Sequence, residues 1–260
     1  NYAVHNCTAY STCSASELQE GTRLVPEYQF ALIKEIAGGD VDSFGADLRS
    51  AVASLKKVGA INEADRPDGF KMGEKDQSFL RRIGNWPEDL KVKALYHAKG
   101  SYMAVVGPYD HFSNIQASIW LFREERKVPI FGILWGWPPE QSIIKEPADG
   151  DFGHAIYSMG WKVIDGETYL IVPNSWGTQN GDKGYYYLSR AVVNKYVTMY
   201  GAFMFTDMTK EEYLARLKPT ILERILYVMA KILGIQMQII TIQESLAPVP
   251  HPRKSRIEEW

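Results

Sequence analysis

The stretch Gly153–Tyr185, GHAIYSMGWKVIDGETYLIVPNSWGTQNGDKGY, decides how the rest of the chain is interpreted. It places His154 at the head of an apolar run, and Asn174 follows twenty residues later within Asn-Ser-Trp-Gly. The aromatic and β-branched runs on either side of Asp165-Gly166 predict two strands joined by a hairpin. A His and an Asn on neighbouring strands form two parts of a unit that activates a nucleophile, so the rest of the chain should supply that nucleophile.

Length and composition set the class of protein. The chain has 260 residues, of which 45% are hydrophobic and 23% are charged, as is ordinary for a soluble globular protein. This length suffices for one large domain or for two halves that share a core. The net charge of -2 gives no reason to expect a nucleic-acid partner. No uninterrupted apolar run reaches about 18 residues, so we expect no transmembrane helix.

The only two cysteines are Cys7 and Cys13. Both fall in one predicted helix, where their spacing turns them to different sides, so we expect no disulfide. The lack of disulfides favours a reducing compartment such as the cytoplasm. Cys7 lies where the helix begins, and a helix N-terminus and a neighbouring protonated His both favour a thiolate, so Cys7 is the candidate nucleophile. Cys13 is interpreted as a small core residue, and since the histidines show no ligand spacing, we expect no metal and no cofactor.

Apolar periodicity, caps and turn residues predict an α+β fold, with a helical first half and an antiparallel β second half. Helices are expected over 7–21, 26–36, 44–59, 87–100 and 113–126, with a long ordered loop over 60–90. Asp42 or Ser43 is the expected cap of the third helix. Strands are expected over 102–107, 127–137, 154–164, 168–176, 184–193 and 201–208. Residues 1–208 are predicted to form one domain, mainly helical over about 1–100 and mainly β over about 101–208.

The end of the chain is predicted to be a helical extension over 209–244, followed by a Pro-rich tail over 245–260. Within the extension, the helix 219–234 carries two neighbouring rows of apolar residues. We expect this apolar face to be buried. It could be covered by its own domain, by a second copy of the chain in a homodimer, or by a membrane surface.

The segments GHAIYSMGW and YLIVPNSWGTQNGDKGYYYL resemble the C-terminal half of the papain-like cysteine peptidases. The matching residues are Gly153, His154, Ala155, Asn174, Ser175, Trp176, Gly177, Gly181, Gly184 and Tyr185. Near the start, Cys7-Thr8-Ala9-Tyr10-Ser11 resembles the Cys-Trp-Ala-Phe-Ser of that family. The resemblance implies a helical domain and a β-barrel-like domain with the active-site cleft between them.

The resemblance also implies the site. Cys7 would be the nucleophile, His154 would carry its proton, and Asn174 would orient His154 through a hydrogen bond shielded by Trp176. The backbone N–H of Cys7 and the side chain of Asn1 would form the oxyanion hole, although the family has Gln at the position of Asn1.

Three further positions depart from the family pattern. Thr8 follows the nucleophile in place of Trp, Asn180 stands where the family has its second Trp, and Val4 replaces a cysteine. The main interpretation is an endopeptidase that acts on a peptide or protein substrate through an acyl-enzyme. One alternative is a papain-like binding or scaffold module that has lost turnover. Another is an aminopeptidase whose C-terminal tail fills part of the cleft.

Overall fold

The computed structural model describes residues 6–43, 45–71, 75–135, 141–147 and 152–206. The chain divides into two units, residues 1–208 and 209–260, and every described residue belongs to the first unit. The predicted extension 209–244, its helix 219–234 and the tail 245–260 lie outside the described residues. Asn1 lies outside them too.

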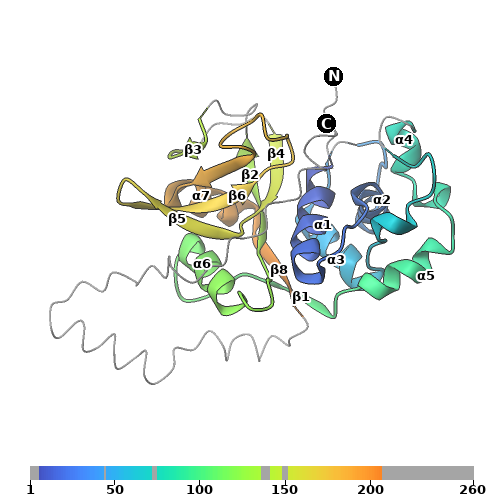
Figure 1. The fold of residues 1–260 in the computed structure, drawn as a ribbon, viewed down its shortest axis with the longest axis horizontal. Helices are drawn as coiled ribbons and strands as arrows, with labels where there is room; N and C mark the ends of the chain where they lie inside the picture. The colour runs from blue at the N-terminus through green and yellow to red at the C-terminus, as the bar shows by residue number, and fades with distance from the viewer. Residues whose placement is uncertain (1–5, 44, 72–74, 136–140, 148–151, 207–260) are drawn as a thin grey trace. The chain divides into compact units, whose positions relative to one another are not determined.

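Helices gather at one end of the first unit, and the strands with two further helices make up the other end (Figure 1). The helices are α1 Cys7–Glu20, α2 Pro26–Ala37, α3 Leu48–Lys57, α4 Gln77–Leu80, α5 Leu90–Ala94, α6 His111–Leu121 and α7 Arg190–Tyr200, with short 3-10 turns η1 Glu63–Asp65, η2 Ile83–Asn85 and η3 Leu95–His97. The strands are β1 Ser101–Ala104, β2 Ile130–Trp135, β3 Ile143–Ile144, β4 Phe152–Tyr157, β5 Gly160–Ile164, β6 Glu167–Pro173, β7 Tyr185–Leu188 and β8 Ala202–Thr206. Within the described ranges, every helix is too short or too polar to span a bilayer.

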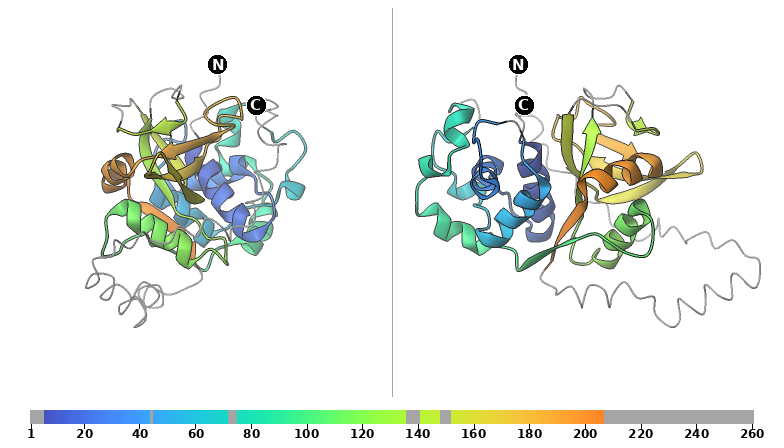
Figure 2. Two further views of the ribbon diagram at one scale, coloured as in Figure 1. Left: turned by 60° about the vertical axis from the view of Figure 1, so that its left-hand side comes forward. Right: turned by 180° about the vertical axis from the view of Figure 1, so that it is seen from behind.

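Helix α1 lies between helices α2–α5 and the strands, as the view from behind also shows (Figure 2). One core cluster joins Cys13 and Ala15 of α1 to Leu55 of α3 and to Ala155 of β4. A second cluster joins Ala9 of α1 to α2 and α3. The small side chains of α1 allow this close approach on both sides.

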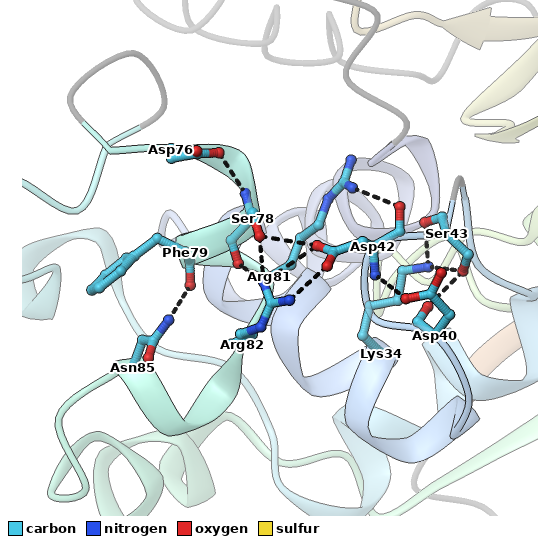
Figure 3. Close-up of polar contacts among 10 residues, drawn as sticks. All are labelled: Lys34, Asp40, Asp42, Ser43, Asp76, Ser78, Phe79, Arg81, Arg82 and Asn85. Carbon is cyan, nitrogen blue, oxygen red and sulfur yellow. Dashed lines mark hydrogen bonds and ion pairs between the residues drawn. The ribbon is translucent and has the colours of Figure 1, made fainter.

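The loop between α2 and α3 is anchored by a polar network (Figure 3). The buried Lys34 donates to the carbonyl of Ser43 at 2.7 Å, and Arg82 pairs with Asp42 at 2.6 Å. Helix α3 is capped instead by Asp47, whose carboxylate accepts the backbone N–H of Ser50 at 2.8 Å. The predicted cap at Asp42 or Ser43 is therefore wrong, because both residues belong to the anchored loop.

The strands form two four-stranded sheets, in the orders β1-β8-β2-β4 and β3-β7-β6-β5. Among the described residues the two sheets do not close into a barrel, and the predicted α+β class is confirmed. All pairs are antiparallel except β3 with β7. The hairpin between β5 and β6 is confirmed, since Asp165 and Gly166 both have positive φ, as this tight turn requires.

The predicted strand 154–164 is in fact two strands in different sheets. The break falls at Ser158 and Met159, whose N–H groups bond to the carbonyls of Pro129 and Ile171, both at 3.1 Å. These bonds carry the chain from the first sheet to the second. His154 and the β5–β6 hairpin therefore belong to different sheets.

The predicted strand 184–193 is also corrected, because only its first part is β7. Ser189 ends the strand and caps α7, its hydroxyl accepting the N–H of Val192 at 3.3 Å. The last residue of α7, Tyr200, packs on Gly132 of β2. A Cβ at Gly132 would lie 2.8 Å from the Cβ of Tyr200, so glycine is what allows α7 to pack here.

Candidate active site

The centre of the site is a hydrogen bond that joins the two sheets. His154 lies on β4, the edge strand of the first sheet, and Asn174 directly follows β6 of the second. Their Nε2 and Oδ1 atoms are 3.0 Å apart, and the side chains are buried, with 5% and 8% exposure. Asn174 is itself fixed by its backbone N–H, which donates to the carbonyl of Gly184 at 2.9 Å.

The partners of Asn174 determine which nitrogen of His154 carries the proton. The Oδ1 atom of Asn174 also accepts the backbone N–H of Ser175 at 2.8 Å, which identifies this atom as the oxygen of the amide. An amide oxygen only accepts, so His154 must donate from Nε2. In the neutral ring, Nδ1 is then left as the basic nitrogen, the form that a general base needs.

Cys7 is the first residue of α1 and is half-buried. It packs against the cluster that contains Ala155, the residue directly after His154. The backbone N–H groups of Ala155, Thr8 and Cys7 itself act to lower the pKa of the thiol. The structure therefore brings the start of α1 to the strand position next to His154.

Burial governs the ionisation of both groups. Burial raises the pKa of the Cys7 thiol above its ordinary value of 9.0, although the three N–H groups act in the opposite direction. Burial lowers the pKa of His154 to about 4, and the hydrogen bond to Asn174 offsets this only in part. At neutral pH the site therefore holds a neutral thiol and a neutral imidazole.

Aromatic rings enclose the imidazole. Trp176 stacks on His154 with ring centroids 4.7 Å apart, and Trp135 meets it nearly perpendicularly at 5.5 Å. Asn180 donates from Nδ2 to the backbone carbonyl of Trp176 at 2.5 Å. The position that departs from the family pattern thus holds the loop that carries Trp176.

Trp135 is a site residue that the sequence alone does not reveal. Aromatic residues on strands are more often core residues, and this side chain is only 4% exposed. The strand register, which the fold sets, places it beside His154. Ile133 pairs with His154, and residues two apart on a strand share a face, so Trp135 lies on the same side of the sheet as His154.

Of the predicted site residues, Cys7, His154, Asn174 and Trp176 come together, and Asn1 lies outside the described residues. Cys13 is a fully buried member of the core, and neither cysteine forms a disulfide. Among the residues that the structure describes, no three His, Cys, Asp or Glu side chains cluster as metal ligands. The catalytic roles themselves remain predictions.

Comparison with known sequences points to the same region of the chain. Residues 140–204 match the sequence model described as papain family cysteine protease. Chymopapain from Carica papaya is 35% identical over 51 residues, which are 20% of this chain and 14% of chymopapain. Cathepsin B-like cysteine proteinase 3 from Caenorhabditis elegans is 45% identical over 38 residues, 15% of this chain and 10% of the relative. The matches therefore span less than a sixth of either relative.

Comparison with solved structures extends over most of the described fold. Xylellain, a cysteine protease from Xylella fastidiosa, aligns with a TM-score of 0.60 and 16% identity over 78% of this chain and 80% of its own. Procathepsin B S9 from Trypanosoma congolense gives 0.57 and 18%, over 78% and 69%. Bromelain from Ananas comosus, solved with the E64 inhibitor, gives 0.52 and 15%, over 76% and 87%.

At these identities the structural likeness concerns the fold, and it confirms the predicted papain-like α+β architecture. The family match lies over the segment that carries His154 and Asn174. Together, the two findings make the chain similar to the papain-like cysteine peptidases, in sequence over residues 140–204 and in fold over most of its length.

Proposed function

We propose that the chain is a cysteine endopeptidase that hydrolyses peptide bonds through an acyl-enzyme, with its activity in residues 1–208. The observation that carries the proposal is the buried 3.0 Å bond from His154 to Asn174, next to Ala155 in the core cluster on which Cys7 packs. The family match and the papain-like fold support the same reaction class.

In this mechanism, the sulfur of Cys7 attacks the peptide carbonyl carbon while its proton passes to Nδ1 of His154. The carbonyl π bond breaks, and the oxyanion is held by the N–H of Cys7 and by Asn1. When the tetrahedral intermediate collapses, the C–N bond breaks and His154 gives the proton to the leaving amine. Water then attacks the thioester, returns a proton through His154 and releases the acid and the free thiol.

The burial of the site gives this mechanism a defined pH dependence. Because the pKa of His154 is lowered to about 4, the imidazole is a free base throughout the neutral range. Because burial raises the pKa of Cys7, the thiol keeps its proton until attack. We therefore expect kcat/KM to rise with pH through a limb near 4, where His154 loses its proton.

The test compares two cysteine variants of the full chain on a library of internally quenched peptides. Cys7→Ala should abolish cleavage, whereas Cys13→Ala should retain it, since Cys13 lies in the core. Cleavage at internal bonds identifies an endopeptidase, and stepwise release of N-terminal residues identifies the aminopeptidase alternative. Full activity of Cys7→Ala would refute the proposal.

The raised pKa of Cys7 is the observation that favours the alternative of a binding module, because reactive cysteines usually have lowered pKa values. In that case the wild-type chain would cleave no peptide in the library, and its thiol would react with iodoacetamide no faster than a free cysteine.

The two free thiols favour a reducing compartment such as the cytoplasm, which we keep as part of the proposal. Burial of helix 219–234 by dimerisation or on its own domain stays a prediction.

A further inference from the structure

We infer that Trp135 is a positioning residue, whose indole blocks movement of the His154 ring within its own plane so that Nε2 meets Asn174. This inference deepens the proposed function and rests on it. Trp135 is the last residue of β2, two positions beyond the residue that pairs with His154. It therefore reaches the imidazole from the strand that is hydrogen-bonded to β4.

The geometry shows why a second ring is needed. The χ2 torsion of a histidine is broad, so a single hydrogen bond at Nε2 does not fix the ring. The stacked Trp176, with an interplanar angle of 27°, resists tilting of the imidazole but leaves it free to turn within its own plane. Trp135 meets the imidazole at 75°, and this perpendicular contact blocks the in-plane movement that stacking allows.

Trp135 is held in place by one ring on the second sheet and one in the loop that follows β6. Its centroid lies 4.9 Å from that of Tyr186 on β7, at an interplanar angle of 77°. It lies 5.5 Å from the ring of Trp176, at 62°. The indole is thus fixed by two neighbours besides His154, so it can act as a rigid stop for the imidazole.

The loop after Asn174 explains why β2 supplies this ring. Asn180 occupies the position where the family pattern has a tryptophan, and its side chain bonds to the carbonyl of Trp176. The neighbouring Gly181 is pressed against Tyr186, since a Cβ there would lie 2.9 Å from Cζ of that ring. Asn180 therefore anchors the loop, and Trp135 provides the second indole beside His154.

The test uses Trp135→Leu, the conservative Trp135→Phe, and Trp161→Leu on β5 as a control outside the ring cluster. We expect Trp135→Leu to lower kcat about tenfold or more with little change in KM, because a small misplacement of a catalytic group is costly. The apparent pKa of the acid limb in the pH profile of kcat/KM should move from about 4 toward the ordinary histidine value of 6.5. Trp135→Phe should restore most of kcat, and Trp161→Leu should leave the limb in place.

A direct readout keeps the inference separate from the proposed function. The ring NMR signals of His154 report its pKa and the proton on Nε2 in any variant, whether or not the chain cleaves peptides. A raised His154 pKa with a faster-exchanging Nε2 proton in Trp135→Leu supports positioning. A folded Trp135→Leu in which these signals, or kcat and the acid limb, match wild type overturns the inference. A loss of thermal stability in both Trp135 variants with an unchanged His154 pKa also overturns it.

Discussion

Replacing Glu20 by Gln is expected to destabilise the first unit by about 3 kcal/mol at neutral pH. Glu20 is the last residue of α1, and its carboxylate accepts hydrogen bonds from Lys99 and, at 2.9 Å, from Ser16, while it also contacts Nδ1 of His97. These contacts attach the segment between η3 and β1 to the end of the central helix. The Glu20 and Lys99 side chains are 19% and 10% exposed, so the pair is largely removed from water.

The magnitude follows from what the substitution leaves behind. Removing one partner of a buried ion pair costs about 3–5 kcal/mol, because the other charge stays buried without compensation. Here Lys99 would be that charge. Gln retains one oxygen as an acceptor and the site keeps some exposure, so the lower end of the range applies.

The pKa of Glu20 determines how its contribution to stability changes with pH. Burial acts to raise the pKa of Glu20, but hydrogen bonds from Lys99 and His97 outweigh it and hold the pKa below the ordinary value of 4.5. A carboxylate with a lowered pKa in the folded state stabilises the protein above the unfolded-state value. That contribution is lost as the pH falls through the folded-state pKa. The difference in unfolding free energy between wild type and Glu20→Gln should therefore be constant above pH 5. It should shrink as the pH falls below 4.5.

Urea denaturation followed by tryptophan fluorescence, repeated from pH 3 to pH 8, measures this difference. Glu88→Gln is the matched control, because Glu88 is 83% exposed in its pair with Lys91 and should leave the midpoint unchanged. A Glu20→Gln variant within 0.5 kcal/mol of wild type at pH 7 would refute the reasoning. So would a difference that persists unchanged at pH 3.

Three further substitutions have defined outcomes. Asn174→Ala removes the 3.0 Å partner of His154 and should lower kcat/KM about 100-fold in a peptide-cleavage assay. Gly132→Ala forces a Cβ to within 2.8 Å of Tyr200 and should cost about 1–3 kcal/mol in urea denaturation. Ser189→Ala removes the cap of α7 and should cost about 1 kcal/mol, measured in the same way.

Each of these variants has a control or a contrary outcome. A fully active, folded Asn174→Ala would mean that His154 does not need its amide partner. Gly84→Ala has open space around its Cβ and should be close to neutral, so equal losses at Gly84 and Gly132 would argue against a steric cause. Ser189→Thr should restore most of the stability that the cap provides. If Ser189→Thr is as unstable as Ser189→Ala, the hydroxyl is not the cause of the loss.

The helical half could be predicted well because its signals are local. Pro26 opens α2 and Gly21 ends α1 in the left-handed conformation, and both residue types have strong backbone preferences. The cap of α3 was misplaced because Asp42, Ser43 and Asp47 offer similar side chains within a few residues. Only the pairing of Asp42 with Arg82, forty residues away, decides among them.

The β half was harder to predict because tertiary contacts decide its breaks. Ser158 lies inside a continuous apolar run, and the carbonyls of Pro129 and Ile171 on other segments turn the chain there. Helix α7 begins with a run rich in Val, which favours strand by propensity. It forms a helix because Ser189 caps it and Gly132 leaves room for Tyr200.

The site residues also differ in whether local sequence or tertiary contacts decide their place. His154, Asn174 and Cys7 could be predicted from a motif, since the chemistry restricts the residue types. Trp135 could not, because an aromatic residue on a strand looks the same in sequence whether it fills the core or holds a histidine. Strand register relative to β4 is what separates the two, and register is a tertiary property.

The most direct test of the account is covalent labelling of the full chain with an epoxide thiol inhibitor of the E64 type, mapped by peptide mass spectrometry. We predict one label per chain, on Cys7, with none on the buried Cys13. We also predict that labelling slows markedly in His154→Ala, because His154 takes the proton of the thiol. Label on Cys13, or labelling of Cys7 at the same rate without His154, would contradict the claim that Cys7 and His154 act as one catalytic unit.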